Sequence, residues 1–531
     1  DTVFKGCRVL EKFKGAVLER LEYKDPFPEL SVRTGYRHYV YLWEEVTDGE
    51  GSGMIHVAPG CGYDDYDFSV KYNLPVLSPL KEDGVYDTGY GEFSEVHYTE
   101  VNKRVYNNLV AKKLLLTSEN YSHRYPHCWR CKEELVFRLV EEWFISTDEI
   151  RPLMQSAAES VEWKPKYVGK LFKDWVKNMG DWCVSRKRYW GLPLPFYECK
   201  CGNLNVLGSK KDLFVRAVGD ASKVKELHRP WVDEVQVSCE VCGHPVDRVK
   251  EVGDCWLDAG VMPFSTLQYF NNKDYWKEWF PADFVCEMRE QTRLWFYATM
   301  FMSVTLEGRP PYRTVVSYEK VHDKHNKPMH KSTGNAVWFN RAVEKFGADT
   351  LRLMYLAQNQ STNMRFNLDE ESGYSRPLLL LWNVLKFFTS LADLENYKYS
   401  PKKLDLSDLD KWVYSELDFT VSQFNELLDD YQFMKLQQTL VKFMDNLSSW
   451  YVRRSRRRLW SEEGNDAKQA ALKTLFDVLL TVSKLLAPLT PFMSEVVYQS
   501  LRQYDNSLNK ESVHLTTYPT SKGLYDSDLR E

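Results

Sequence analysis

The chain has 531 residues, which is too many for one hydrophobic core, so several domains are expected. Its 43% hydrophobic and 27% charged residues are ordinary for a soluble globular protein. Its net charge of −5 excludes a wholly basic nucleic-acid coat but leaves local basic patches open. We recognise no signal segment and no run of ~18 apolar residues, so we expect a cytoplasmic protein with no membrane partner.

The spacing of apolar and turn residues changes along the chain. The first ~115 residues are expected to be rich in strands, because short apolar stretches alternate there with turn residues. Cysteine pairs bracket a small module between about Cys199 and Lys250, and from Glu251 to about Gln358 strand-like and helical runs alternate as in an α/β domain. Beyond about Leu406 the spacing predicts long amphipathic helices, one ending at Leu486 and the next opening at Thr490-Pro491.

A histidine and an aspartate flank a glycine-rich turn in the N-terminal part. The run Met54–Ala58, which follows Gly51 and Ser52, is predicted to be a strand that carries His56 to the turn, and Asp65 comes soon after it. Such a pair could bind an amino group and position a hydrolytic water. A structural histidine is the alternative.

Three close cysteine pairs indicate metal ligands rather than disulfides. The pair Cys128 and Cys131 either binds zinc with a pair preceding Asp1 or is idle. The other two pairs could close a tetrahedral four-thiolate zinc site, and two unrelated clusters of reduced cysteines are the alternative. The expected ligands are Cys199, Cys201, Cys239 and Cys242.

Carboxylates, an amide and an indole lie close together between residues 287 and 295. If this segment is helical, Glu287, Gln291 and Trp295 share one face with Glu290 alongside. These groups could hold an ammonium group and a ribose while the indole packs on an aliphatic side chain. An amphipathic helix with salt bridges is the alternative.

The loop from Lys327 to Asn335 contains Lys331 and Ser332 next to a glycine. A lysine and a serine in such a loop can form a mobile cationic lid over phosphates. An ordinary surface loop is the alternative.

An arginine-rich helix is predicted near Trp450 and Tyr451. Its guanidinium groups repel one another unless anions neutralise them, and the phosphates of a folded RNA suit the bidentate geometry of arginine. A solvated face paired with acidic residues is the alternative. The arginines are Arg453, Arg454, Arg456, Arg457 and Arg458.

Four motifs occur in an order that resembles the isoleucyl-tRNA synthetases, a family of class I aminoacyl-tRNA synthetases. The run Trp182–Gly191 resembles the family's DWCISRQRYWG signature, and Asp254–Gly260 resembles DxWFDSG. The stretch Trp450–Trp460 is similar to the anticodon-binding bundle of the eukaryote-like group, and Tyr125–Cys131 to the exit from the editing insertion. The resemblance covers essentially the whole chain.

The resemblance implies ATP-dependent activation of isoleucine, transfer to isoleucine tRNA and hydrolytic editing of misactivated valine, with Mg²⁺ accompanying ATP and a structural Zn²⁺. Glu287, Glu290 and Gln291 would contact the aminoacyl-adenylate, and Trp295 would line the side-chain pocket. Lys331 and Ser332 would act in the KMSKS loop, while His56 and Asp65 would lie in the editing site. Editing is needed because one methylene is worth only ~1–3 kcal/mol in a pocket. We expect a monomer.

The fold implied is multidomain α/β: a partial Rossmann-type catalytic domain with a remnant of the β-rich editing domain, a zinc-binding insertion and an all-α anticodon-binding bundle. The expected divisions are 1–118 for the end of the editing domain, 119–198 for the return to the catalytic core, 199–250 for the zinc insertion, 251–360 for the second Rossmann half, 361–404 for a stem-contact linker and 405–531 for the bundle.

The sequence also departs from the family pattern. No His-x-Gly-His string occurs, so the HIGH element and the first half of the nucleotide fold are missing, and the threonine-rich editing strand is absent too. KMSKS reads Pro328-Met329-His330-Lys331-Ser332. In place of EGxDQ, Met288 replaces the glycine and Glu290 the aspartate, and Leu294 replaces a small glycine beside Trp295.

We therefore expect an N-terminally truncated synthetase that is inactive alone. One alternative is a non-catalytic tRNA-binding paralogue. A second is a zinc-dependent scaffold whose arginine helix binds an acidic protein.

Overall fold

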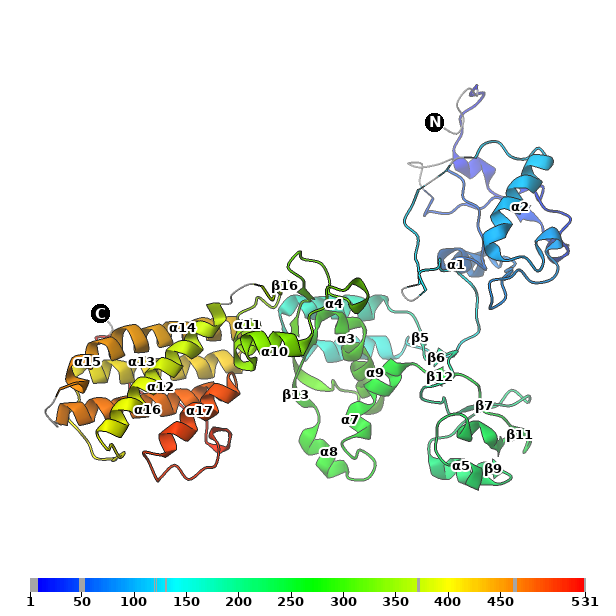
Figure 1. Ribbon diagram of the computed structural model, residues 1–531. Coiled ribbons are helices and arrows are strands. Elements are labelled where there is room, and N and C mark those ends of the chain that lie inside the picture. Colours follow the sequence, from blue (N-terminus) through cyan, green and yellow to red (C-terminus); the bar gives the residue numbers. More distant parts are fainter. Residues whose placement is uncertain are drawn as a thin grey trace. The chain divides into compact units, whose positions relative to one another are not determined.

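The computed structural model describes residues 8–46, 53–118, 120, 122–128, 131–369, 373–461 and 466–529 (Figure 1). The chain divides into two compact units, Asp1–Glu142 and Trp143–Glu531.

The first unit has few strands. Its described residues form one antiparallel pair, β1 (Glu22–Tyr23) with β2 (His38–Tyr39), and two α-helices, α1 (Tyr63–Tyr72) and α2 (Tyr98–Ala111). The predicted strand Met54–Ala58 is not formed, because no neighbouring segment among the described residues pairs with its backbone. The expectation of a strand-rich region is thus wrong for this part of the structure. A small core holds the unit together: Leu30, Tyr90, Phe93, Val96 and Val101.

A three-stranded parallel sheet organises the first half of the second unit. Its order is β13 (Ala282–Met288), β14 (Tyr312–Tyr318) and β4 (Glu162–Lys164), with α3 (Ile150–Glu159), α4 (Lys166–Asn178) and α9 (Trp295–Glu307) nearby (Figure 1). Apolar runs such as Thr314-Val315-Val316 suit a buried parallel strand. Trp163, Phe172 and Phe296 pack together in the core beneath the sheet.

The cysteine-bracketed module is a separate small fold with its own core around Tyr197, Leu213 and Val237. Its elements are β7 (Phe196–Glu198), β8 (Leu204–Val206), α5 (Lys210–Arg216), β9 (Ala217–Val218), β10 (Gln236–Ser238) and β11 (Pro245–Val246).

The C-terminal part is helical, as the periodicity predicts. α16 ends at Leu486 and α17 begins at Pro491, at the predicted boundaries. A π-helical segment, Asn446–Val452, joins α14 to α15. The helices are α12 (Arg376–Leu394), α13 (Asp408–Asp429), α14 (Phe433–Asp445), α15 (Arg453–Leu459), α16 (Asp466–Leu486) and α17 (Pro491–Arg502).

Helix α12 lies within the segment expected to be a linker, and its Leu381, Val384 and Phe388 are buried in the same core as α13 to α17. With its preceding turn, Gly373–Leu394 is long and apolar enough to cross a membrane by length and composition, so the expectation that no such run exists is wrong by that measure. A core helix meets the same test, and the burial of these side chains is that of a core helix.

Candidate functional site

The carboxyl ends of β13, β14 and β4 lie at one edge of the sheet, which is where open α/β sheets bind ligands. Glu319 follows β14 there, and its Oε1 accepts hydrogen bonds from the Tyr167 hydroxyl (2.8 Å) and from Arg289 Nε (2.6 Å). Burial, together with the carboxylate of Glu319, raises the pKa of Tyr167 to about 12. The edge is therefore a connected polar network that fixes Arg289 directly after β13.

The residues predicted to share a helical face are brought together by a turn instead. Glu287 lies in β13, Glu290 and Gln291 lie in a 3₁₀ helix (Arg289–Arg293), and Trp295 opens α9. The helical prediction is wrong because β13 stays paired with β14 as far as Met288. Gln291 Oε1 accepts a hydrogen bond from the backbone N–H of Trp295 (2.9 Å), so its amide fixes the start of α9.

Glu290 is held by a lysine that the motif search missed. Its Oε1 lies 2.5 Å from Lys320 Nζ, while its Oε2 is buried and has no hydrogen-bond partner among the described residues. A buried acceptor without a donor is costly unless a ligand supplies one. The position of Glu319 and Lys320 directly after a strand was the sequence signal that could have revealed them.

The loop that contains Lys331 has a rigid base and an exposed tip. The Asn335 amide donates to Asp323 Oδ2 (2.9 Å) and to the carbonyl of Pro328 (3.0 Å). The hydrogen bonds from Asn335 and from backbone N–H groups hold the pKa of Asp323 below its usual value. Lys331 and Ser332 are exposed in a short 3₁₀ turn, with Lys331 Nζ 4.8 Å from the centroid of the Trp338 ring.

His56 and Asp65 are placed differently in the first unit. His56 is exposed and lines a cavity of about 860 Å³, whereas Asp65 lies in α1 and is not among the lining residues. Asp65 Oδ1 accepts a hydrogen bond from the backbone N–H of Ala58 (3.2 Å), which fixes the turn. Gly51 and Ser52 lie outside the described residues.

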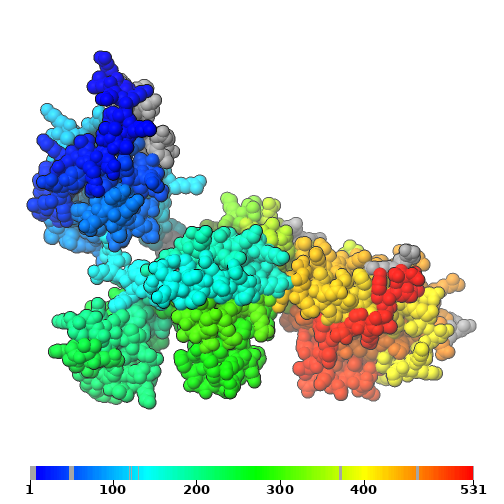
Figure 2. Space-filling view, turned by 180° about the vertical axis from the view of Figure 1, so that it is seen from behind, coloured from blue at the N-terminus to red at the C-terminus, as the bar shows by residue number. Residues whose placement is uncertain are grey.

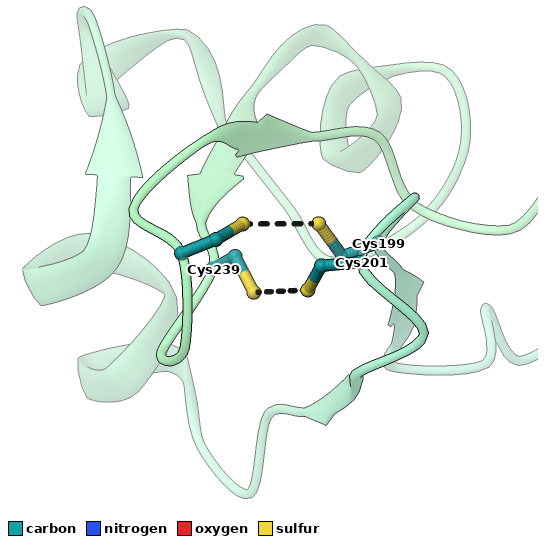
Figure 3. Close-up of side chains that lie close together, drawn as sticks. Cys199, Cys201 and Cys239 are labelled. Carbon is teal, nitrogen blue, oxygen red and sulfur yellow. Dashed lines mark hydrogen bonds between the residues drawn. The ribbon is translucent and has the colours of Figure 1, made fainter.

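The two cysteine pairs of the small module converge, as predicted. The sulfurs of Cys199, Cys201, Cys239 and Cys242 all lie within 4.8 Å of one another, and Figure 3 labels the first three. Cys199 Sγ is 3.4 Å from Cys242 Sγ, and Cys201 Sγ is 3.8 Å from Cys239 Sγ. A tetrahedron with Zn–S bonds of ~2.3 Å has edges of about 3.8 Å, so this donor set fits zinc.

The surroundings of Cys239 favour a thiolate. Backbone N–H groups, chiefly that of Cys242, lower the pKa of Cys239 to about 5 although burial opposes them. The side-chain amides of Asn203 and Asn205 lie 3.7 and 3.6 Å from its sulfur. The folded chain has thus already arranged a site for a thiophilic cation.

Cys128 and Cys131 lie in a turn whose hydrogen bonds match those of the turn that starts at Cys239. Cys128 N–H donates to the carbonyl of Glu133 (2.8 Å), just as Cys239 N–H donates to that of His244 (2.9 Å). Trp129 and Arg130 lie outside the described residues. Within the described residues no third ligand joins this pair, which leaves both predicted alternatives open.

The arginine helix presents four of its five guanidinium groups to solvent. Arg453, Arg454, Arg456 and Arg457 are exposed, and Arg454 lies 3.7 Å from the ring centroid of Trp450. Arg458 instead turns inward: its two terminal nitrogens each lie 2.5 Å from an oxygen of Asp410, whose side chain is fully buried. At Arg458 the alternative reading, in which arginines pair with acidic residues of the protein, is therefore confirmed.

Comparison with known proteins agrees with this arrangement. Residues 63–367 match the tRNA synthetases class I (I, L, M and V), and residues 410–531 match the anticodon-binding domain of tRNA ligase. The isoleucine–tRNA ligases of Methanosarcina barkeri and Archaeoglobus fulgidus are 37% and 35% identical over 97% and 99% of this chain. These alignments cover 49% and 51% of the two relatives, so the chain spans about half the length of the curated relatives it matches.

Among solved structures, the chain is similar to a LeuRS of Agrobacterium radiobacter K84 in complex with tRNA, with a TM-score of 0.48 and 17% identity over 65% of this chain and 43% of that one. The family match covers more than half of the chain and coincides with the parallel sheet and the helical C-terminal part. The chain belongs to the class I tRNA synthetases of the isoleucine, leucine, methionine and valine group.

Proposed function

We propose that this chain is part of an isoleucine–tRNA ligase. The reaction joins the isoleucine carboxylate to the α-phosphate of ATP with release of pyrophosphate, and then transfers the acyl group to isoleucine tRNA with release of AMP. The identity of 35–37% to ligases of this name across almost the entire chain carries the proposal. ATP enters with Mg²⁺ as substrate.

The edge of the parallel sheet supports adenylate binding at Glu287, Glu290 and Gln291. The buried Oε2 of Glu290 is an acceptor suited to a substrate ammonium or hydroxyl, and Trp295 would line the side-chain pocket. The exposed Lys331 and Ser332 would reach the leaving phosphates, where positive charge stabilises the transition state.

The 531-residue chain alone should make no isoleucyl-adenylate, because its sequence contains no His-x-Gly-His string to grip ATP. Isoleucine-dependent exchange of pyrophosphate into ATP measures this directly. Exchange above background by the purified chain would contradict the expected inactivity, and the same assay on the full-length protein tests the ligase assignment itself.

Editing and metal binding complete the proposal. His56 and Asp65 would serve hydrolysis of misactivated valine in residues 1–118, beside the cavity that His56 lines. Zn²⁺ at Cys199, Cys201, Cys239 and Cys242 would fold the module of residues 199–250. As part of the same proposal, residues 119–198 return to the catalytic core, residues 251–360 form the second Rossmann half and residues 405–531 form the bundle, in a monomeric, cytoplasmic protein.

Three substitutions favour a second candidate, a non-catalytic tRNA-binding paralogue. Met288 adds bulk directly before the turn that carries Glu290, and Pro328 and His330 alter the loop before Lys331. Pyrophosphate exchange by the full-length protein that is lost in Lys331→Ala would exclude it. Full exchange in Lys402→Ala, an exposed lysine outside the proposed sites, is the matched control.

We also propose that the exposed arginines bind tRNA. Arg453, Arg454, Arg456 and Arg457 present their charges to solvent, whereas Arg458 is engaged by Asp410 and is left out of this surface. Charge reversal of Arg454 and Arg457 should weaken salt-sensitive binding of isoleucine tRNA. Unchanged binding would favour the scaffold alternative.

A further inference from the structure

A groove of about 890 Å³ lies between the β4–α4 segment and the helical part of the second unit. Lys164 joins its two walls: Nζ pairs with Glu162 (3.1 Å) on one side and donates to the carbonyl of Asp430 (2.9 Å) on the other, where it also pairs with the Asp430 carboxylate. In Figure 2 the cyan surface of the first segment adjoins the yellow surface of the second. The contacts of Lys164 therefore hold the two sides of the groove together in the folded unit.

One wall of the groove is a face of lysines on α4. Lys166, Lys170 and Lys173 are spaced i, i+4 and i+7, so they project from the same side of the helix, and all three line the groove. Lys177 continues the helix but does not line the groove.

The opposite wall offers one more ammonium group, aromatic rings and amides. Lys435 of α14 lines the groove together with Tyr431 and Phe433. The loop from Gln358 to Ser361 also lines the groove and contributes consecutive polar side chains, with donors that suit hydroxyl groups and base edges.

The protein neutralises the lysines of the groove only in part. Three acidic residues line the groove, and two of them, Glu162 and Asp430, are already paired with Lys164. Among the described ranges of the chain, no ion pair engages the other lining lysines: Lys166, Lys170, Lys173 and Lys435. Ammonium groups crowded into a concave surface repel one another and concentrate anions there.

We propose that this groove binds the sugar–phosphate backbone of a tRNA, at a site separate from the arginine helix. The lysines contact phosphates, and the amides of the Gln358–Ser361 loop contact ribose hydroxyls or exposed base edges. The proposal rests on the proposed function, since it takes tRNA as the partner. A polyanionic strand suits a groove that combines a line of cations with aromatic and amide side chains better than an acidic peptide does.

Binding of an isoleucine tRNA transcript to the 531-residue chain, measured across a salt series, tests the proposal. The variant K166Q/K170Q/K173Q should bind more weakly and should lower the slope of log K against log salt by about 2, because each lost phosphate contact removes ~0.7–0.9. The control K177Q/K402Q/K403Q removes the same charge from exposed lysines outside the groove and should leave the slope almost unchanged. Circular dichroism checks that both variants are folded.

The possible failures are distinguishable. Suppose that the groove variant keeps the wild-type slope of log K against log salt while R454E/R457E loses binding. This result would overturn the groove as a binding site and would leave tRNA as the partner. An equal loss of affinity in the control variant would overturn the groove site, because a general charge effect would then explain the result. Displacement of tRNA by polyglutamate at equal charge would overturn RNA as the partner of the groove. A wild-type chain that binds no tRNA would remove the partner from the proposed function as well.

Lysine acetylation gives a second measurement. Bound tRNA should protect Lys166, Lys170, Lys173 and Lys435 from an acetylating reagent and leave Lys177 reactive. Equal protection of Lys177 would contradict a groove-specific contact.

Discussion

The inward-facing Arg458 shows how one residue in a charge run can serve stability while its neighbours remain exposed to solvent. Its partner Asp410 also accepts hydrogen bonds from Tyr451 (2.6 Å) and from Ser407 (2.6 Å). Burial acts to raise the pKa of Asp410, yet the hydrogen bonds from Arg458, Ser407 and Tyr451 outweigh it and hold the pKa below its usual value. Both oxygens of the buried Asp410 carboxylate are thus hydrogen-bonded inside the bundle, whereas Arg458 Nε has no hydrogen-bond partner among the described residues.

Arg458→Ala should destabilise the chain by about 3 kcal/mol, because it leaves the carboxylate of Asp410 buried without its cation. Arg457→Ala, next to it and exposed, should change stability by no more than about 0.5 kcal/mol. Urea unfolding followed by circular dichroism compares the two. Equal stabilities would show that the ion pair contributes nothing to the fold.

The lowered pKa of Asp410 also predicts an acid response. A carboxyl whose pKa is depressed on folding adds stability that is present above its unfolded pKa, about 3.9, and is lost as the pH falls through the folded pKa. Asp410→Asn should be less stable than wild type at pH 7, and the difference should shrink below about pH 4. The exposed Asp408→Asn should follow the wild-type profile, and a constant difference down to pH 2 would contradict the assignment.

At the scale of elements, the cysteine-bracketed module was the part most fully predictable, because ligand chemistry fixes which side chains must meet. Its polar support was not visible in the sequence: buried Asn205 donates to Cys239 Sγ and to the carbonyl of Tyr197 (3.1 Å), and it accepts a hydrogen bond from Arg216 (2.7 Å). Such partners orient metal ligands and tune their basicity.

Asn205→Leu should therefore weaken zinc retention by roughly 10–100-fold, the usual effect of losing a partner that orients a ligand. Lys200→Ala, an exposed residue between two of the cysteines, should have little effect. Transfer of metal to a colorimetric chelator provides the measurement. Identical release from both variants would mean that Asn205 does not support the site.

Sequence periodicity predicted elements best where one pattern continued over many residues, as in α16 and α17. It failed at Glu287 to Trp295, because strand, 3₁₀ turn and helix succeed one another within nine residues and tertiary pairing with β14 decides where the strand ends. It failed again at Met54–Ala58, where an apolar run finds no partner strand among the described residues. Residues such as Lys320 meet their partners only through the sheet, so spacing along the chain could not reveal them.

At the scale of the whole chain, α11 (Ala348–Leu356) couples the region matched to the catalytic family with the region matched to the anticodon domain. Asp349 accepts hydrogen bonds from the backbone N–H groups of Met493 (2.7 Å) and Phe492 (3.4 Å) at the start of α17. Arg352 donates to the carbonyls of Leu489 and Pro488, 2.8 Å each. Asp349 thus supplies the cap that Thr490, although in the N-cap position, does not provide through its own side chain.

Asp349→Ala should cost about 1–2 kcal/mol, the usual effect of losing a helix cap, and it should loosen the joint between the two regions. Calorimetry should then show two thermal unfolding transitions that are better separated than those of the wild type. Glu344→Ala, on the exposed side of the preceding helix, should unfold as the wild type does. One unaltered transition in Asp349→Ala would indicate that other contacts hold the joint.

The π-helical turn before α15 has a consequence for the direction of every arginine that follows it. One residue corresponds to about 100° of rotation around a helix, so deleting Ser449 would shift each later side chain into the place of its predecessor. Arg456 would then enter the fully buried position of Ser455, and Leu459 would face Asp410 in place of Arg458. The length of the π-helical turn sets the rotational position of the arginines, so that four positive charges face solvent and a single one faces the interior.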